Sequence, residues 1–140
     1  MILRKAKFDD WKILLDWRND PISRANSFDQ NEITEETHKS WFSKSLKNPE
    51  RSIYILEDKE KNALGTIRCD LNQDNTKTLS WNINPSNRGQ GYGSLILKIF
   101  MESNEGNFIA EIKEGNIASI KIAEKNGFIK HSKQVYKFKK

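Results

Sequence analysis

Three of the seven glycines in this 140-residue chain, Gly89, Gly91 and Gly93, fall within one five-residue stretch. Glycine in regular structure costs roughly 0.5–1 kcal/mol relative to alanine, so such a cluster marks a backbone that bends sharply or lies close to another group. Before it, residues 78–83 (TLSWNI) alternate like a strand; after it, residues 94–100 (SLILKIF) have the spacing of a buried helix. A strand, a glycine turn and a helix in this order often bind an anion, because the first N–H groups of the helix are unpaired.

Composition indicates one globular domain, residues 1–140, with 36% hydrophobic and 31% charged residues. No run approaches the ~20 apolar residues that cross a bilayer, and the first residues, MILRKAKFDDW, lack the apolar core of a secretory signal. We therefore expect a cytoplasmic protein with no membrane partner. The single cysteine, Cys69, cannot form an internal disulfide and is expected to be a buried thiol.

The net charge of +5 is consistent with binding of a polyanionic ligand such as a nucleotide or a coenzyme. The basic residues are spread along the chain, without an Arg-rich arm, zinc-finger spacing or an RNA-binding aromatic motif. We therefore expect no nucleic-acid partner, and we expect no metal site.

Hydrophobic periodicity and capping residues predict the order β-α-α-β-β-β-α-β-α-β. Pro21 is expected to end the first helix and to open a polar loop that runs to about Asn31. Thr34 and Asn116 are expected to cap two later helices, and Gly127 to close the last one. The pattern predicts a mixed α/β fold, in which an antiparallel meander is followed by a right-handed crossover. The expected strands are 2–6, 51–58, 63–71, 76–84, 107–114 and 128–139, and the expected helices are 9–20, 34–48, 88–104 (with its loop) and 116–127.

Two common glycine motifs do not fit the loop. A nucleoside-triphosphate P-loop needs Lys-Ser/Thr after its last glycine, whereas Gly93 is followed by Ser94 and Leu95. A dinucleotide fingerprint follows the first strand of a parallel unit, whereas this loop follows an antiparallel meander. Backbone amides from Gly89 to Ser94 could converge on a diphosphate, with Arg88 adding positive charge. A tight turn that only packs the helix onto the sheet is the alternative.

The segment RGQGYG (residues 88–93) resembles the Arg/Gln-x-x-Gly-x-Gly/Ala signature of the GNAT family of N-acetyltransferases. Ile83-Asn-Pro85 stands where that family has its Val/Ile-x-Pro strand end. Residues 116–128 (NIASIKIAEKNGF) are similar to the family segment Asn-x-x-Ser/Ala…Glu-Lys-x-Gly-Phe. The resemblance covers essentially the whole chain.

This resemblance implies an acyl-CoA N-acyltransferase fold, a mixed α/β sheet with splayed central strands and helices on both faces. It implies direct transfer of acetyl from acetyl-CoA, the cosubstrate, to a primary amine, with no metal. The residues expected to hold the coenzyme are Ile83, Arg88, Gly89, Gln90, Gly91, Tyr92, Gly93, Ser94 and Asn116.

The catalytic groups depart from the family pattern. Many members carry a tyrosine seven residues after the Asn of the last helix, where this chain has Ala123, so Ser119 or a water is expected to serve as the acid. The usual glutamate on the strand that ends at Ile83 is also missing. His38, Glu111 and Asp70 are the candidate bases, and His38 is equally compatible with a role in packing.

The first third of the chain resembles acetyltransferases that act on nucleotide-linked amino sugars in pseudaminic-acid-type pathways, so we expect a small-molecule amine as acceptor. Arginines there would pair with a diphosphate, and aromatic rings would stack on a base or sugar. For Trp17 and Trp41, ordinary core packing is the alternative. The residues that carry this resemblance are Trp17, Arg18, Asn19, Arg24, Ser27, Ile33, His38, Trp41 and Phe42, and Arg68 is counted with them as a binding residue.

Two other functions fit the same motifs. Ribosomal-protein N-terminal acetyltransferases share the C-terminal segment and also lack the tyrosine. A non-catalytic acyl-CoA sensor would explain the missing acid and base. The protein is expected to be a monomer or a homodimer.

Overall fold

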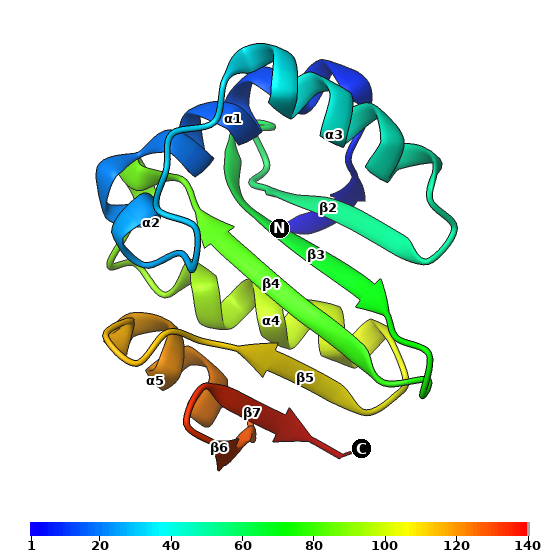
Figure 1. Cartoon of the computed structure of the whole chain (residues 1–140), viewed down its shortest axis with the longest axis vertical. Helices are drawn as coiled ribbons and strands as arrows, with labels where there is room; N and C mark the ends of the chain where they lie inside the picture. Colours follow the sequence, from blue (N-terminus) through cyan, green and yellow to red (C-terminus); the bar gives the residue numbers. More distant parts are fainter. Residues whose placement is uncertain (140) are drawn as a thin grey trace.

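The computed structural model describes residues 1–139, which form a seven-stranded sheet in the order β1-β2-β3-β4-β5-β7-β6 (Figure 1). The strands are β1 (Ile2–Lys5), β2 (Arg51–Glu57), β3 (Ala63–Leu71), β4 (Lys77–Ile83), β5 (Phe108–Glu111), β6 (Ile129–Ser132) and β7 (Val135–Phe138). The helices are α1 (Trp11–Asn19), α2 (Pro21–Ala25), α3 (Glu35–Lys47), α4 (Tyr92–Ser103) and α5 (Ile117–Lys125), with short 3-10 turns at Phe8–Asp10 and Pro85–Asn87.

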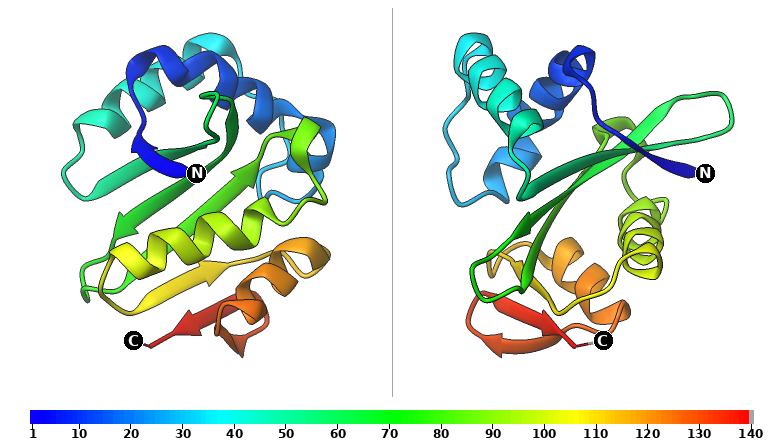
Figure 2. Two further views of the ribbon diagram at one scale, coloured as in Figure 1. Left: turned by 180° about the vertical axis from the view of Figure 1, so that it is seen from behind. Right: turned by 90° about the vertical axis from the view of Figure 1, so that its right-hand side faces the viewer.

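Strands β1 to β4 pair antiparallel in sequence order, and β4 pairs parallel with β5 after the crossover through α4. Helices cover both faces of this sheet: α1 and α3 lie on one face, α4 and α5 on the other (Figure 2). The expected mixed α/β fold is confirmed.

Two hydrophobic clusters hold these layers together. The larger cluster fills the face under α4 and α5, and includes Ile67, Ile96 and Phe108, all fully buried. The smaller cluster lies between α1, α3 and β2, and has Trp17 and Phe42 at its centre. Cys69 is half-buried beside the larger cluster, and this burial raises the pKa of its thiol.

β4 and β5 separate soon after they meet, and this divergence shapes the centre of the sheet. They pair only at Lys77–Phe108 and Thr78–Ile109, whereas β4 continues to Ile83 (Figure 1). Beyond β5, the backbone N–H of Ile112 donates to the carbonyl of Gln134, on the β7 side. The expected splay of the central strands is confirmed.

Three expected boundaries were wrong. Pro21 does not open a loop. Asp20 caps a new helix, α2, and Pro21 occupies its first position. Proline is suited to that position, because the backbone N–H that it lacks would have no partner within the helix. The strand expected over 107–114 is ordered as β5 only to Glu111, because the backbone beyond it diverges. The extended C-terminal segment is a hairpin, in which β7 inserts between β5 and β6.

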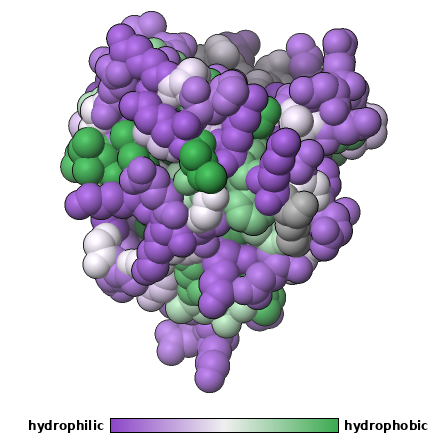
Figure 3. Space-filling view, turned by 90° about the horizontal axis from the view of Figure 1, so that it is seen from below, coloured by the Kyte–Doolittle hydropathy of each residue, from purple (hydrophilic) through white to green (hydrophobic). Residues whose placement is uncertain are grey.

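The surface seen from below is mainly hydrophilic, with apolar atoms in small separate patches (Figure 3). Among residues 1–139, no helix combines the length and the apolar character that crossing a membrane requires.

Gly93 lies where α4 packs against α5. It is on the buried stripe of α4, and a Cβ there would overlap the Cδ1 atom of Ile122 on α5. A side chain at this position would therefore force the end of the Ile122 side chain to move.

We expect Gly93→Ala to lower the free energy of unfolding by about 1–2 kcal/mol, because overpacking outweighs the gain in helix propensity. Ile122→Val removes the overlapping Cδ1 atom, so it should rescue part of this loss in the double variant. Denaturant unfolding measures both effects. Gly115→Ala is the matched control, since a Cβ at Gly115 meets nothing within 4 Å. Additive costs for Gly93→Ala and Ile122→Val would contradict the packing role.

Candidate functional site

The glycine loop between β4 and α4 exposes its backbone. Gly89 and Gly91 have φ of 77° and 83°, values that side chains rarely allow, and a Cβ at either position would meet nothing within 4 Å. Gly91 is the N-cap of α4, and it lacks a side chain that could cap the helix. The first N–H groups of α4 therefore have no side-chain cap, and this leaves them available to an anion.

Neighbouring residues fix this loop in place. Asn126, which follows α5, donates to the Ser94 hydroxyl at 3.1 Å, and this hydrogen bond links α4 to α5. It also fixes Ser94 in the first turn of α4. Tyr92 packs against the larger cluster, and Gln90 is exposed. Asn116 caps α5 by accepting from the Ser119 N–H at 3.2 Å.

The edge of β4 beside the loop has no strand partner within residues 1–139. β3 pairs with one edge of β4 as far as Ile83, whereas β5 leaves the other edge after Thr78. Backbone groups on that second edge, up to Ile83, can therefore pair with an extended ligand.

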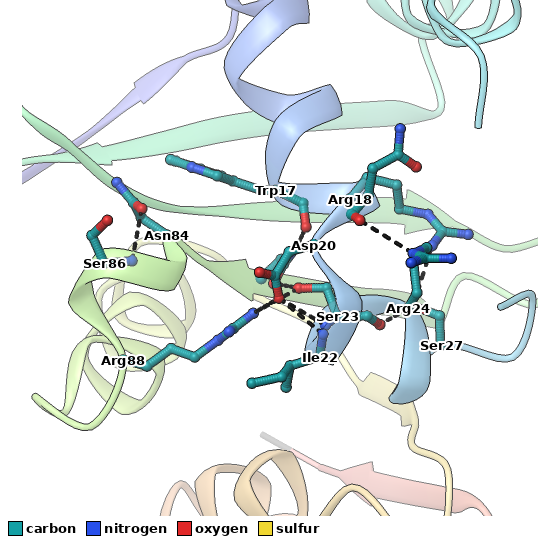
Figure 4. A network of polar contacts seen from close by, with 12 residues as sticks. Trp17, Arg18, Asp20, Ile22, Ser23, Arg24, Ser27, Asn84, Ser86 and Arg88 are labelled. Atoms are coloured by element: carbon teal, nitrogen blue, oxygen red, sulfur yellow. Dashed lines mark hydrogen bonds and ion pairs between the residues drawn. The ribbon is translucent and has the colours of Figure 1, made fainter. Parts of the chain in front are cut away.

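Arg88, the first residue of the loop, pairs with the segment between α1 and α2 (Figure 4). Its Nη2 lies 2.6 Å from the Asp20 carboxylate and 2.9 Å from the Ser23 hydroxyl. Burial acts to raise the pKa of Asp20, but hydrogen bonds from Arg88 and from the Ser23 N–H outweigh it and lower that pKa. Within residues 1–139, the Nε and Nη1 atoms of Arg88 have no hydrogen-bond partner.

A second polar cluster lies on the sheet face opposite α4. Asp70 accepts from the Nε of Arg51 at 2.6 Å and from the Nε of Arg68 at 3.1 Å, so each carboxylate oxygen is engaged. Arg51 also donates to the buried Ser45 hydroxyl at 3.0 Å. Both guanidinium groups lie over the Trp41 ring, 5.6 and 5.7 Å from its centroid.

This cluster carries more positive than negative charge. Burial lowers the pKa of Arg68, Asp70 opposes this effect, and the nearby charges of Arg51 and Arg18 reinforce it. Two arginines therefore share one carboxylate in a partly desolvated setting, and the charge of Arg18 acts on them from nearby. Such an excess favours an anion at this face.

A family model described as an acetyltransferase (GNAT) domain matches residues 1–129. The chain belongs to the GNAT family. It is thus an enzyme that transfers acetyl groups, and enzymes of this family take them from acetyl-CoA. A sequence comparison with curated proteins found no significant match.

Solved structures share the GNAT fold over nearly the whole chain. Spermidine N-acetyltransferase from Vibrio cholerae, in complex with CoA and spermine, has a TM-score of 0.86 and 14% identity, covering 97% of this chain and 92% of that one. An N-acetyltransferase from Staphylococcus aureus Mu50 has a TM-score of 0.78 and 21% identity, covering 99% and 97%. A domain from Methanocaldococcus jannaschii DSM 2661 has a TM-score of 0.77 and 26% identity, covering 98% and 96%.

Two residues that the sequence predicts for the acceptor pocket of this GNAT enzyme make their main contacts with other residues of the protein. Trp17 is 3% exposed and belongs to the smaller hydrophobic cluster. The Asn19 amide donates to the Ile33 carbonyl and accepts from the Ile33 N–H, both at 2.8 Å. These side chains position the segment between α1 and α3.

Two half-buried arginines lie close to this segment, Arg18 in α1 and Arg24 in α2 (Figure 4). Arg18 donates to the Asp29 carbonyl at 3.1 Å and lies 3.4 Å from the Ser27 hydroxyl. Arg24 donates to the Asn19 carbonyl at 3.2 Å. Neither guanidinium forms an ion pair with a carboxylate in the described chain, so both are available to pair with an anionic ligand.

His38 lies in the contact between α1 and α3. It is 4% exposed, its Nε2 is 2.9 Å from the Trp11 carbonyl, and its ring stacks on Phe42 with centroids 5.9 Å apart. Burial lowers the pKa of His38, partly opposed by the Trp11 contact. These contacts fit the packing alternative.

The other expected catalytic positions lie near the diverging strands. Glu111 is exposed and ends β5, and Ser119 is half-buried in the first turn of α5. Ala123, at the position where many family members have tyrosine, is fully buried in the larger cluster. Asp70 is held by two arginines, as described above.

Sequence reasoning missed Arg51, Asp20 and Ser23. Arg51 faces Asp70 across the β2–β3 pair, and an aligned hairpin register would have indicated this. Asp20-Pro21 is a recognisable helix start, with a capping residue followed by proline. The contacts of Asp20 and Ser23 with Arg88 join residues 65 to 68 positions apart, which no local pattern reports.

The buried His38 should make stability depend on pH. Its folded-state pKa is lowered, so the unfolded chain binds the proton first and stability falls as the pH drops below about 6.5. The slope should reach at most ~1.4 kcal/mol per pH unit, and His38→Gln, which keeps an N–H donor but cannot ionise, should reduce it. Denaturant unfolding at several pH values measures this slope. The exposed His131→Gln is the matched control; equal slopes in His38→Gln and wild type would refute the assignment.

Proposed function

We propose that this enzyme acetylates the primary amine of a small, negatively charged molecule, of the nucleotide-linked amino-sugar type. The observation that carries this proposal is the cluster of Arg51 and Arg68 around Asp70, with Arg18 close enough to add to its positive charge. A diphosphate on the acceptor would balance the excess positive charge around Asp70.

The chemistry of the cluster suits a nucleotide. Arginine presents several N–H donors in a plane and pairs with phosphate oxygens in a bidentate manner. Trp41, whose ring lies near both guanidinium groups, is 37% exposed, so its accessible part can also contact a base or sugar. Arg18 and Arg24 extend the positive charge along the neighbouring segment.

A polyamine is a less suitable acceptor for this chain. The Vibrio cholerae neighbour was solved with spermine, a polycation. Three arginines against one aspartate would repel such a molecule, since like charges in a partly desolvated site cost more than in water. The two proteins share the fold at 14% identity, and the charge of the acceptor face need not be shared.

The glycine loop and the free edge of β4 fit acetyl-CoA. Amides from Gly89 to Ser94 would hold the pyrophosphate, helped by the unpaired edge of Arg88, and backbone groups near Ile83 would pair with the extended arm. Asn116 lies at the start of α5, across the diverging strands. The bound coenzyme supplies the acetyl thioester; the amine nitrogen bonds to its carbonyl carbon as the C–S bond breaks.

Two protons must be handled in this exchange. The amine loses one, and we assign its acceptance to Glu111, the exposed carboxylate at the end of β5. The departing thiolate gains one, which we assign to a water oriented by Ser119, since a serine hydroxyl is itself a weak acid. His38 supports the α1–α3 contact in this scheme.

Substitution of Gly91 tests the coenzyme site. Gly91→Asn adds a side chain in open space, and asparagine tolerates positive φ better than other residues. We expect acetyl-CoA affinity to fall by more than about tenfold, with little change in melting temperature. Calorimetric titration measures the affinity, and Gly115→Asn is the control. Unchanged affinity in a folded Gly91→Asn protein would rule out the loop as the pyrophosphate site.

Substitution of the arginines tests the acceptor. A shielded pair between arginine and phosphate contributes about 1.5–3 kcal/mol, so Arg68→Ala or Arg18→Ala should raise the KM for a UDP-linked 4-amino sugar at least tenfold. The KM for acetyl-CoA should barely change. Thiol-release kinetics measure both constants, and Lys98→Ala on the exposed side of α4 is the charge-matched control.

The choice of acceptors separates the alternatives in the same assay. Turnover with the sugar nucleotide, and its loss in the arginine variants, would support the proposal. Turnover with peptides alone would instead favour an N-terminal acetyltransferase. Turnover with a polyamine that both arginine variants improve would show that the acceptor is a cation.

A further inference from the structure

Helix α2 connects the two arms of the diverging sheet. At its start, Ser23 donates to the side chain of Asn82 on β4 at 3.2 Å and accepts from Arg88 of the glycine loop. At its end, the Ala25 carbonyl accepts from the Lys113 ammonium, which follows β5, at 3.0 Å. This five-residue helix therefore spans the place where β4 and β5 separate.

Asp20 is the residue that anchors the start of this helix. Its Oδ2 accepts hydrogen bonds from the backbone N–H groups of Ile22 and Ser23, each at 3.1 Å. The same oxygen forms an ion pair with the Nη2 of Arg88 at 2.6 Å (Figure 4). The Asn82 amide donates to the Trp17 carbonyl at 3.3 Å, just before Asp20. One carboxylate thus joins the helix cap to the glycine loop.

We propose that Asp20 is a positioning residue, which uses Arg88 to couple the coenzyme loop to α2 and the acceptor segment. This inference rests on the proposed coenzyme site. Arg88 uses its Nη2 group to contact Asp20 and Ser23, so its Nε and Nη1 groups remain available to donate to a phosphate. A guanidinium can hold both anions at once, since its donors form a rigid planar fork.

The coupling has a direction. Phosphate bound to the free edge of Arg88 fixes that side chain, and the fixed side chain holds Asp20 and the first turn of α2. Arg24 lies in α2 and Arg18 lies two residues before Asp20, at the end of α1, so coenzyme binding orders both arginines before the amine arrives. An ammonium in place of the guanidinium would hold one anion or the other.

Hydrogen exchange with and without coenzyme A tests this coupling. In the wild type, coenzyme A should slow exchange at short labelling times both in the loop, residues 88–94, and in residues 21–26, by about threefold or more. Asp20→Asn keeps an equally good helix cap but removes the ion pair. In that variant the loop should still be protected, whereas the protection of residues 21–26 should disappear.

Two further variants sharpen the outcome. Arg88→Lys should behave like Asp20→Asn at residues 21–26, because the single nitrogen of lysine lacks the second donor edge with which Arg88 can hold a phosphate and Asp20 in fixed geometry. Asp16→Asn, on the exposed side of α1, is the matched control and should keep the wild-type pattern. Equal protection of residues 21–26 in Asp20→Asn and wild type, or none in either, overturns the coupling. Absence of protection in residues 88–94 would instead contradict the coenzyme site itself.

Discussion

The early end of the β4–β5 pairing is the constraint on which the site depends. A continuous sheet would satisfy the backbone groups of β4 on both edges, and an extended ligand would find nothing to pair with. After Thr78, one edge of β4 is released, and the glycine loop stands at the end of that edge. β5 stays anchored in the sheet, because β7 pairs with its other edge along the whole strand.

Much of the fold could be predicted because its signals are local. Apolar spacing in α4, the capping residues Thr34 and Asn116, and the hairpin-length turns each reflect contacts within a few residues. The C-terminal hairpin was not predicted, since the four residues of β6 are all exposed and show no buried face that would separate them from β7. The α2 helix was missed because proline was taken as the end of a helix, although it also begins one.

In the candidate site too, the features with local sequence signals could be predicted, and those that depend on distant contacts could not. The glycine loop was predictable, because its backbone geometry demands glycine at Gly89 and Gly91. For Trp17 and His38 the sequence left both ligand binding and packing open, and it did not indicate the contacts of Asn19 with Ile33, since an aromatic or amide side chain looks alike in sequence whether it meets a ligand or a neighbouring helix. Only the three-dimensional contacts reveal that Asp70 holds two arginines, one of them on a different strand.

The side chain of Asn19 imitates a peptide group, with one donor and one acceptor both matched to Ile33. The segment between them is thereby closed into a ring whose closure depends on its two ends and not on its interior sequence. The entropy of closing such a ring changes slowly with its length, so extra residues between Ala25 and Ile33 would cost little closure entropy. The first half of the ring is constrained in addition by the contacts of Asp20, Ser23 and Ala25 with the rest of the sheet. Length can therefore vary in the second half of the ring while α1, α2 and α3 keep their positions on the sheet.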